Sequence, residues 1–178
     1  MALFLAEIRT PADIDSTLDQ IRAATAEAGA DFVEAQVTAD RSQVFAIIEA
    51  QDEAIADRVR TELATAGLTV EALSAVRLVG ADIDEIKAQR PASGYLVEWD
   101  LPDGLTMDAY LARKKEKSPL YAQVPETTFQ RTYVREDMVK CLCFYDAPDA
   151  EAVLRARDVV GAPVDRLHEL SEIDSTAL

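Results

Sequence analysis

Short runs of alternating apolar and polar residues predict strands along this chain, and segments with a 3.6-residue hydrophobic period predict helices between them. In the first half, strands are predicted at 3–8, 31–37, 43–48 and 70–79. Thr10 and Asp13 predict the start of one helix, with Pro11 in its first turn, and Asp52 predicts the cap of a second. A glycine follows each helix. The order is β-α-β-β-α-β, which is the ferredoxin-like unit.

The second half repeats this order. Strands are predicted at 95–100, 129–134, 139–145 and 164–173, with a frayed tail from Ser171 onwards. Thr106 and Asp149 predict the caps of two helices. The segment 44–52 also resembles 141–149, because each is an apolar strand followed by an acid, an alanine and a capping aspartate. Two copies of one unit predict two similar subdomains.

The boundaries follow from this repeat. We expect one unit at 1–80, a linker at 81–93 with a short helical turn around Ile83 and Ile86, and a second unit at 94–178. A single ferredoxin-like unit covers only one face of its sheet with helices, so its other face must pack on something. The expected fold class is therefore α+β, with the two sheets packed face to face as a pseudo-symmetric dimeric α+β barrel. Two independent domains are the alternative, which the short linker disfavours.

Composition narrows the function classes. The chain has 178 residues, 49% of them hydrophobic, and a net charge of −15. Nucleic acids and anionic membranes attract a surplus of Lys and Arg, so neither is an expected partner. No apolar run is long enough for a membrane span, and the start lacks a signal-peptide pattern. We expect a cytoplasmic protein, a monomer as a fused dimer or a weak homo-oligomer, with a small molecule as its partner.

Strand alternation suggests which side chains line a cleft between the sheets. Phe45, Ile47, Leu142 and Phe144 are assigned to the helix-covered core, as are Val33, Ala35 and Val37. The opposite parity gives an apolar wall with a few polar groups, the usual composition of a small-molecule site. Its second-half members are Glu98, Phe129, Arg131, Tyr133, Cys141, Cys143 and Tyr145, and its first-half members are Glu7, Glu34 and Gln36. Phe32, Val44, Ala46 and Ile48 are assigned to the same face. The alternative is an ion-pair network without a ligand, such as Arg131 with Glu34 or Glu7.

Three further features have two interpretations each. Cys141 and Cys143 are either two ligands of a soft metal or small buried strand residues. The lone histidine, His168, is either packed or a general base. The basic run 113–117 is either a solvated helix face or a gate for an anionic ligand, bordered by aromatic residues. Those aromatic residues are Trp99, Tyr110 and Tyr121.

Several segments of the second half resemble the DUF4242 family of small ferredoxin-like proteins. They are Tyr95-Leu-Val-Glu98, Leu101-Pro-Asp-Gly-Leu105, Thr132-Tyr-Val134, Cys143-Phe-Tyr-Asp-Ala-Pro148 and Gly161-Ala-Pro-Val-Asp-Arg166. The resemblance covers about residues 93 to 174 and implies a dimeric α+β barrel, with nickel binding in some members. The first half resembles the family only through the repeat, so the chain looks like a fused form of the family's dimer.

The chain departs from the family where nickel would need histidine. Members often carry His two residues before the Tyr-Val of the second strand and midway along the last helix, where this chain has Arg131 and Ala156. Glu98 and Cys143 stand at matching positions. A divalent metal normally requires imidazole or several carboxylates. We therefore expect no cofactor and no metal site.

Three functions remain. The first is a binding protein that holds a small molecule, or less readily a metal, in the cleft. The second is a cofactor-independent enzyme of isomerase, cyclase or monooxygenase type, in which Glu98 is the acid or base and Arg131 stabilises an anion. Tyr133, Tyr145 or Cys143 would then donate protons. The third is a structural module without a site. The first two predict that Glu98 and Arg131 face a common cavity.

Overall fold

The computed structural model describes residues 1–10, 13–89 and 91–172. Pro11, predicted in a first helical turn, and 173–178, predicted as the end of a strand and a tail, lie outside this part. The chain divides into two compact units. Of the described residues, the first contains those of 1–76 with α3 (Ile83–Gln89) and 171–172, and the second contains 77–82 and 92–170. None of the helices described could span a membrane, because none is both long and apolar enough.

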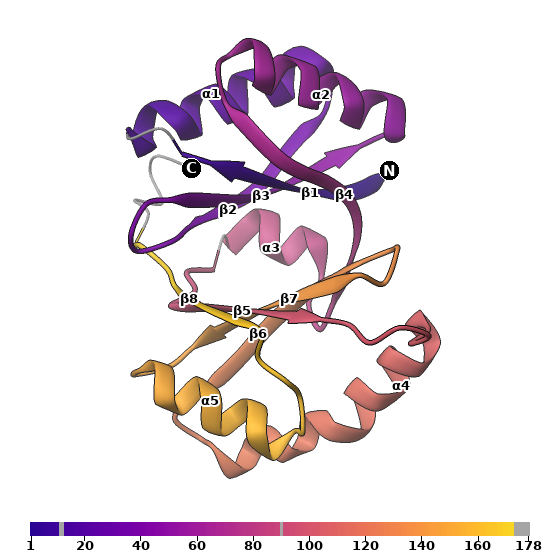
Figure 1. Cartoon of the computed structure of the whole chain (residues 1–178), viewed down its shortest axis with the longest axis vertical. Coiled ribbons are helices and arrows are strands. Elements are labelled where there is room, and N and C mark those ends of the chain that lie inside the picture. The colour runs from indigo at the N-terminus through magenta and orange to yellow at the C-terminus, as the bar shows by residue number, and fades with distance from the viewer. Residues whose placement is uncertain (11–12, 90, 173–178) are drawn as a thin grey trace. The chain divides into compact units, whose positions relative to one another are not determined.

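The first unit is a four-stranded antiparallel sheet with two helices on one face (Figure 1). Its strands lie in the order β2-β3-β1-β4, and the C-terminal end of β4 belongs to the second unit. Helices α1 and α2 pack their apolar sides, which include Leu18, Ile21 and Val59, on this sheet. The elements are β1 (Ala2–Arg9), α1 (Ile14–Ala28), β2 (Asp31–Val37), β3 (Gln43–Ala50), α2 (Glu53–Thr65) and β4 (Thr69–Val79).

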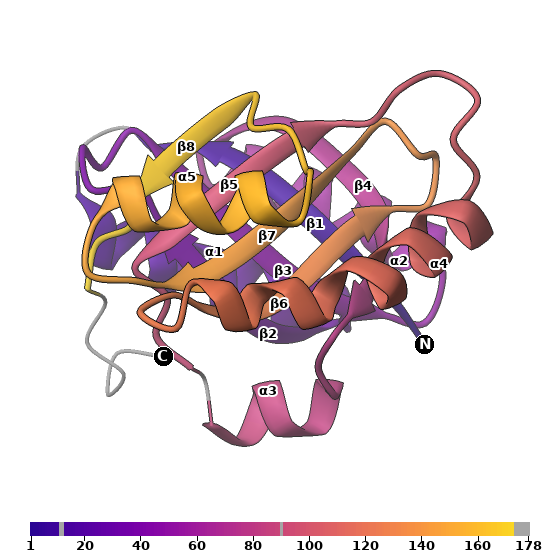
Figure 2. The same ribbon diagram turned by 90° about the horizontal axis from the view of Figure 1, so that it is seen from below.

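The second unit repeats the element order. Its strands lie in the order β6-β7-β5-β8, and α4, η1 and α5 lie on one face of them (Figure 2). The element order in each unit is β-α-β-β-α-β, as predicted. The elements are β5 (Tyr95–Asp100), α4 (Met107–Lys117), the 3-10 helix η1 (Ser118–Gln123), β6 (Thr128–Arg135), β7 (Lys140–Asp146), α5 (Ala150–Val159) and β8 (Arg166–Glu169).

Local differences from the prediction have local causes. The N-cap of α1 is Asp13, whose carboxylate accepts a hydrogen bond from Ser16 N at 3.4 Å. Thr10, the predicted cap, instead donates its hydroxyl to the carbonyl oxygen of Arg41. The helical turn expected near Ile86 is the complete helix α3. Helix η1 was not predicted, because its sequence lacks a helical hydrophobic period.

A β-bulge interrupts the second strand of each unit at the same place. In β2 the register shifts between Phe32 and Glu34, and in β6 it shifts between Phe129 and Arg131. A bulge inserts one residue that has no opposite number on the neighbouring strand, so side chains beyond it point to the other face. Phe32 and Phe129 therefore pack on the helix-covered side, although alternation placed them on the opposite face with Glu34 and Arg131.

The predicted faces of β3 and β7 were wrong. Cys141, Cys143 and Tyr145 lie in the core beneath α4 and α5, and Val44, Ala46 and Ile48 lie in the core beneath α1 and α2. The residues assigned to those cores lie on the faces away from the helices. There Phe144 and Leu142 are the cross-strand neighbours of Arg131 and Tyr133. Both faces of these strands are buried and apolar, and periodicity cannot tell which of two apolar faces meets the helices. The helix-covered positions of Ala35 and Val37 were predicted correctly.

The matched N-caps of α2 and α5 give a test of this local reasoning. Asp52 accepts from Ile55 N at 3.0 Å and Asp149 accepts from Ala152 N at 2.8 Å. Replacing either with Ala removes this side-chain acceptor from the helix start. Each change should lower the free energy of unfolding by about 1 kcal/mol in urea titrations. Asp57→Ala, at an exposed position inside α2, is the control and should change it by less than about 0.5 kcal/mol.

Candidate functional site

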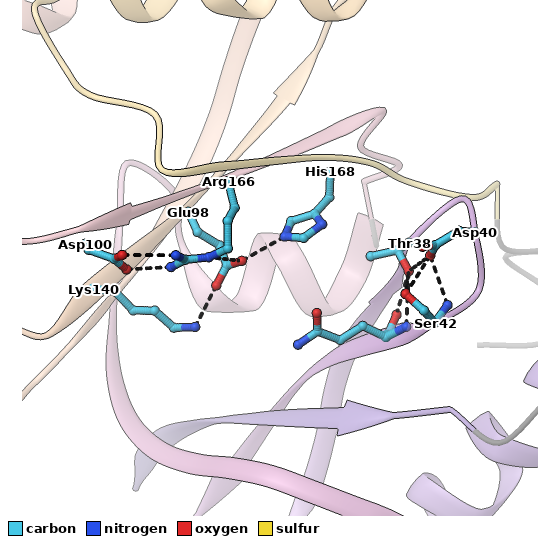
Figure 3. A network of polar contacts seen from close by, with 9 residues as sticks. Thr38, Asp40, Ser42, Glu98, Asp100, Lys140, Arg166 and His168 are labelled. Carbon is cyan, nitrogen blue, oxygen red and sulfur yellow. Dashed lines mark hydrogen bonds and ion pairs between the residues drawn. The ribbon is translucent and has the colours of Figure 1, made fainter.

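One buried carboxylate organises the face of the second sheet opposite α4 and α5. Glu98, on β5, is 3% exposed and receives three basic groups (Figure 3). Lys140 Nζ lies 2.6 Å from its Oε1, while Arg166 Nε and His168 Nε2 lie 2.9 Å and 2.7 Å from its Oε2. Arg166 also forks onto the exposed Asp100. The three basic groups come from β7 and β8, so the cluster links β5 to both of its neighbouring strands.

This setting fixes the charge of Glu98. Burial alone would raise the pKa of its carboxyl, but hydrogen bonds from His168 and Lys140, the charge of Lys140 and the bond from Arg166 lower the pKa to about 2. A carboxyl with such a pKa carries no proton to give at neutral pH and is a weak base. The geometry therefore suits an ion-pair centre, and it does not suit the general acid or base that the sequence suggested for Glu98.

Arg131 and Tyr133 share this face of the sheet with Glu98. Arg131 is the cross-strand neighbour of Phe144, and Tyr133 and Glu98 are both cross-strand neighbours of Leu142, so these side chains lie on the same face. Arg131 is fully buried, donates to Ser93 Oγ at 3.2 Å and stacks on the ring of Phe144 at 4.5 Å. The sequence correctly placed these three side chains on one face. Their role in a ligand site stays a prediction.

In the first unit, Glu7, Glu34 and Gln36 lie on the face opposite α1 and α2. Glu7 and Gln36 stand opposite Phe45, and Glu34 stands opposite Ile47. Gln36 Nε2 donates to Glu34 Oε2 at 3.3 Å. A separate polar network closes the turn after β2 (Figure 3), in which one oxygen of Asp40 accepts from the hydroxyls of Thr38 and Ser42 at 2.6 Å and 2.7 Å. That turn matches the predicted one.

The helix-covered side of the second sheet holds the remaining predicted residues. Cys141 and Cys143 are buried on β7 with their sulfur atoms 3.9 Å apart. The hydroxyl oxygens of Tyr145 and Tyr121 lie 2.8 Å apart, and Phe129 stacks on Tyr121 with ring centres 5.5 Å apart. The residues predicted to line one cleft wall therefore lie on both faces of the sheet.

A hollow opens between α4, η1, α5 and β5 on this helix-covered side. It contains about 390 Å³ of space free of protein atoms, part of it open to solvent. Four cationic side chains line it, namely Arg113, Lys114, Lys117 and Arg157. Three aromatic rings and three smaller residues complete the lining, namely Trp99, Tyr110 and Tyr121 with Ser118, Val160 and Ala162. Such a mixture of apolar walls and convergent charges is typical of small-molecule sites.

The sequence of α4 explains why so much charge gathers there. Residues three or four apart lie on the same helix face, so Tyr110, Lys114 and Lys117 form one row while Lys115 points elsewhere. Lysines in the last turn also interact favourably with the negative end of the helix dipole. The basic run 113–117 was predicted to be either a solvated helix face or a gate for an anion. Arg113, Lys114 and Lys117 of this run border the hollow, together with the three aromatic residues named with it.

Arg157, on α5, is the residue that sequence reasoning missed. It is 3% exposed, and its guanidinium donates to Cys143 Sγ at 3.4 Å, to Tyr145 Oη at 3.3 Å and to the carbonyl of Pro163 at 2.5 Å. Its Nε has no hydrogen-bond partner in the part of the chain that the structure describes. An arginine in the middle of the buried, otherwise apolar stripe of α5 was the available signal.

The second half of the chain is similar to a known family. The model of the family described as "Nickel responsive protein SCO4226-like" matches residues 95–170, which is less than half of the chain. The crystal structure of SCO4226 from Streptomyces coelicolor A3(2) is 18% identical, with a TM-score of 0.40, and the match covers 46% of this chain and 99% of that one. No curated protein matches significantly.

Two solved structures match over nearly the whole chain. A putative chlorite dismutase, TA0507, is 13% identical with a TM-score of 0.58, and the match covers 99% of this chain and 98% of that one. A putative monooxygenase from Lactobacillus acidophilus NCFM is 10% identical with a TM-score of 0.50, covering 96% and 94%. At these identities the likeness concerns the fold alone. Both are of the ferredoxin-like dimeric α+β barrel type, which confirms the predicted α+β class.

The described residues do not fit a nickel ion. They contain no group of three or more His, Cys, Asp or Glu side chains that could hold a metal. Cys143 has the guanidinium of Arg157 at 3.4 Å, and the ammonium of Lys114 reaches Thr132 beside it. Two cations next to a thiol repel a metal cation and stabilise a negative sulfur instead. Arg131 likewise replaces an imidazole with a permanent cation.

The Glu98 cluster should make the protein sensitive to acid. The pKa of Glu98 is lower in the folded state than in the unfolded chain, so its contribution is complete above about pH 4.5 and is lost as the pH falls toward 2. The shift corresponds to about 3 kcal/mol. In urea titrations, Glu98→Gln should lower the free energy of unfolding by about that amount at pH 7 and flatten its decline in acid.

Glu136→Gln is the matched control for this change. Glu136 pairs with Arg77 at 3.0 Å, but both side chains are exposed, so its loss should cost less than about 1 kcal/mol. Equal losses in the two variants, or an undiminished acid dependence in the Glu98 variant, would contradict the role of Glu98 as a buried ion-pair centre.

Proposed function

We propose that the protein binds a small organic anion with a flat apolar part, and that the hollow beneath α4, η1 and α5 is its site. The observation that carries this proposal is the meeting of four cations and three aromatic rings around one opening in a chain with a net charge of −15. A cluster of positive charges in an otherwise acidic protein requires nearby negative charge to balance it. A bound anion would supply that charge.

The charges of the hollow are poorly matched by acids of the chain itself. Lys117 has Glu116 at 3.1 Å, but no carboxylate pairs with Lys114 or Arg157 among the described residues. Burial lowers the pKa of Lys114, which shows the cost of holding an ammonium there. An anion in the hollow would offset this cost, because opposite charges attract more strongly where water is excluded.

The apolar lining defines the rest of the ligand. Trp99 and Tyr110 have ring centres 6.1 Å apart, and Arg113 and Arg157 approach the face of Trp99 at 5.9 Å and 5.8 Å. A flat ring or conjugated chain would contact these surfaces while its anionic group reaches the cations. The enclosed part of the hollow is small, about 40 Å³, and the rest is open to solvent, which favours a small molecule held partly at the surface.

The alternatives from the sequence keep less support. A fold shared with a putative monooxygenase does not carry that protein's activity to this chain, because function depends on the site. The enzyme hypothesis assigned proton transfer to Glu98, whose ion pairs oppose it. A small-molecule binding protein remains the function that the geometry favours.

Benzoate is a suitable first probe, and Trp99, the single tryptophan, reports its binding by fluorescence. The wild-type protein should bind benzoate, and it should not bind benzyl alcohol at the same concentrations, because the alcohol lacks the charge. Lys114→Gln should weaken benzoate binding about tenfold, since Lys114 is partly buried, and Lys117→Gln should weaken it about threefold.

Lys115→Gln is the matched control, because it removes the same charge from α4 at an exposed position that does not line the hollow. Its benzoate affinity should stay within about twofold of the wild type. Equal binding of benzoate and benzyl alcohol, or equal losses from Lys114→Gln and Lys115→Gln, would refute an anion site in this hollow.

A further inference from the structure

Behind the hollow, the sulfur of Cys143 is surrounded by hydrogen-bond donors. Cys143 is 1% exposed and stands opposite Thr132 across the β6–β7 ladder. Thr132 Oγ1 lies 2.9 Å from its Sγ, and Arg157 Nη1 lies 3.4 Å from it. A guanidinium can only donate, so the sulfur must accept from Arg157.

The direction of the neighbouring hydrogen bonds supports the same assignment. Lys114 Nζ lies 3.5 Å from Thr132 Oγ1, and because an ammonium can only donate, the hydroxyl accepts there and directs its proton toward the sulfur. Cys141 Sγ lies 3.9 Å away, and either sulfur could donate in that contact. Two donors that converge on one sulfur, one of them a cation, favour its thiolate form, which is an acceptor.

Electrostatics agree with this geometry. The hydrogen bond from Cys141 and the charges of Arg157 and Lys114 together outweigh burial and hold the pKa of the Cys143 thiol well below its usual range. The pKa of Cys141 is raised well above its usual range, first by its bond to Cys143 and then by burial. Of the two thiols, Cys143 is therefore the one that ionises more readily.

The cations that hold this charge also line the hollow. Arg157 donates to the sulfur directly and Lys114 reaches it through Thr132, and both belong to the lining. The buried Nε of Arg157 has no partner among the described residues. Other titratable groups packed around the sulfur could shift its proton equilibrium. From their respective elements they are Tyr110 on α4, Tyr121 on η1, and Cys141 and Tyr145 on β7.

We propose that Cys143 is the internal counter-anion of the hollow, and that a bound anion displaces its charge. When an anion binds, it takes over Arg157 and Lys114, and the sulfur takes up one proton from solvent and becomes a thiol. One negative charge replaces another, so the net charge of the region is unchanged. A ligand with a single carboxylate or sulfonate fits this exchange. The inference rests on the proposed function, because it concerns the same hollow.

The exchange of an anion for a proton can be measured on the wild-type protein. Calorimetric titration with benzoate at neutral pH, in two buffers of different ionisation enthalpy, should show uptake approaching one proton for each benzoate bound. The ultraviolet absorption of the thiolate should fall in parallel. Affinity should rise as the pH is lowered from about 8 to about 6, because protonation of the sulfur then costs less.

The variant Cys143→Ser removes the thiolate with little change in shape. It should bind benzoate about tenfold more tightly than the wild type, take up no proton, and show a weaker pH dependence, with only the titration of Lys114 remaining. Val134→Ala, a buried change on the same side of the sheet outside the hollow, controls for altered packing and should leave proton uptake unchanged.

The outcomes separate the two proposals. Benzoate binding without proton uptake would overturn the role of Cys143 and leave the anion site standing. The absence of a thiolate signal, measured as the difference between the unliganded wild type and Cys143→Ser, would overturn it even if no ligand binds. Binding by the Ser variant alone would support the competition, whereas no binding by either protein would overturn both proposals.

Discussion

The β-bulge in β6 is the constraint on which the second unit depends. By inserting one residue between Phe129 and Arg131, it turns Phe129 toward the helices and Arg131 toward the opposite face. The same shift sets Thr132 directly opposite Cys143. Without it, an arginine would enter the helix-covered core and the hydroxyl that faces the sulfur would point away from it. The equivalent bulge in β2 shows that this register change belongs to the unit itself.

The bulge also keeps two centres of buried charge on separate faces of one sheet. On one face, the carboxylate of Glu98 receives Lys140, Arg166 and His168. On the other, the sulfur of Cys143 accepts from Arg157. Each buried charge needs its own partners, because desolvation of an unpaired ion costs several kcal/mol. The two centres differ in how their cations are placed. Those around Glu98 form a compact ion-pair cluster with it, whereas those around Cys143 also line a hollow.

The sequence predicted local features well and face assignments poorly. The capping residues Asp52, Thr106 and Asp149 gave correct helix starts, because capping depends on neighbouring residues alone. The common face of Glu98 and Arg131 was also predicted. The helix-covered positions of Phe129 and Cys143 were not, since a bulge leaves no clear trace in hydrophobic alternation and both faces of β7 are apolar. Arg157 escaped notice because its importance comes from tertiary contacts between α5 and β7, which hydrophobic periodicity does not report.

The overall charge of the protein bears on what the hollow can accept. At a net charge of −15 the chain repels anions at long range, and this repulsion grows with the charge of the ligand. At physiological salt such interactions are screened beyond about 8 Å, so the cations of the hollow act only on a molecule that has already reached them. A polyanion is therefore opposed more strongly than a monoanion during its approach. A monoanion with an apolar ring meets less repulsion on the way in and contacts Trp99 on arrival, so global and local charge select for the same kind of ligand.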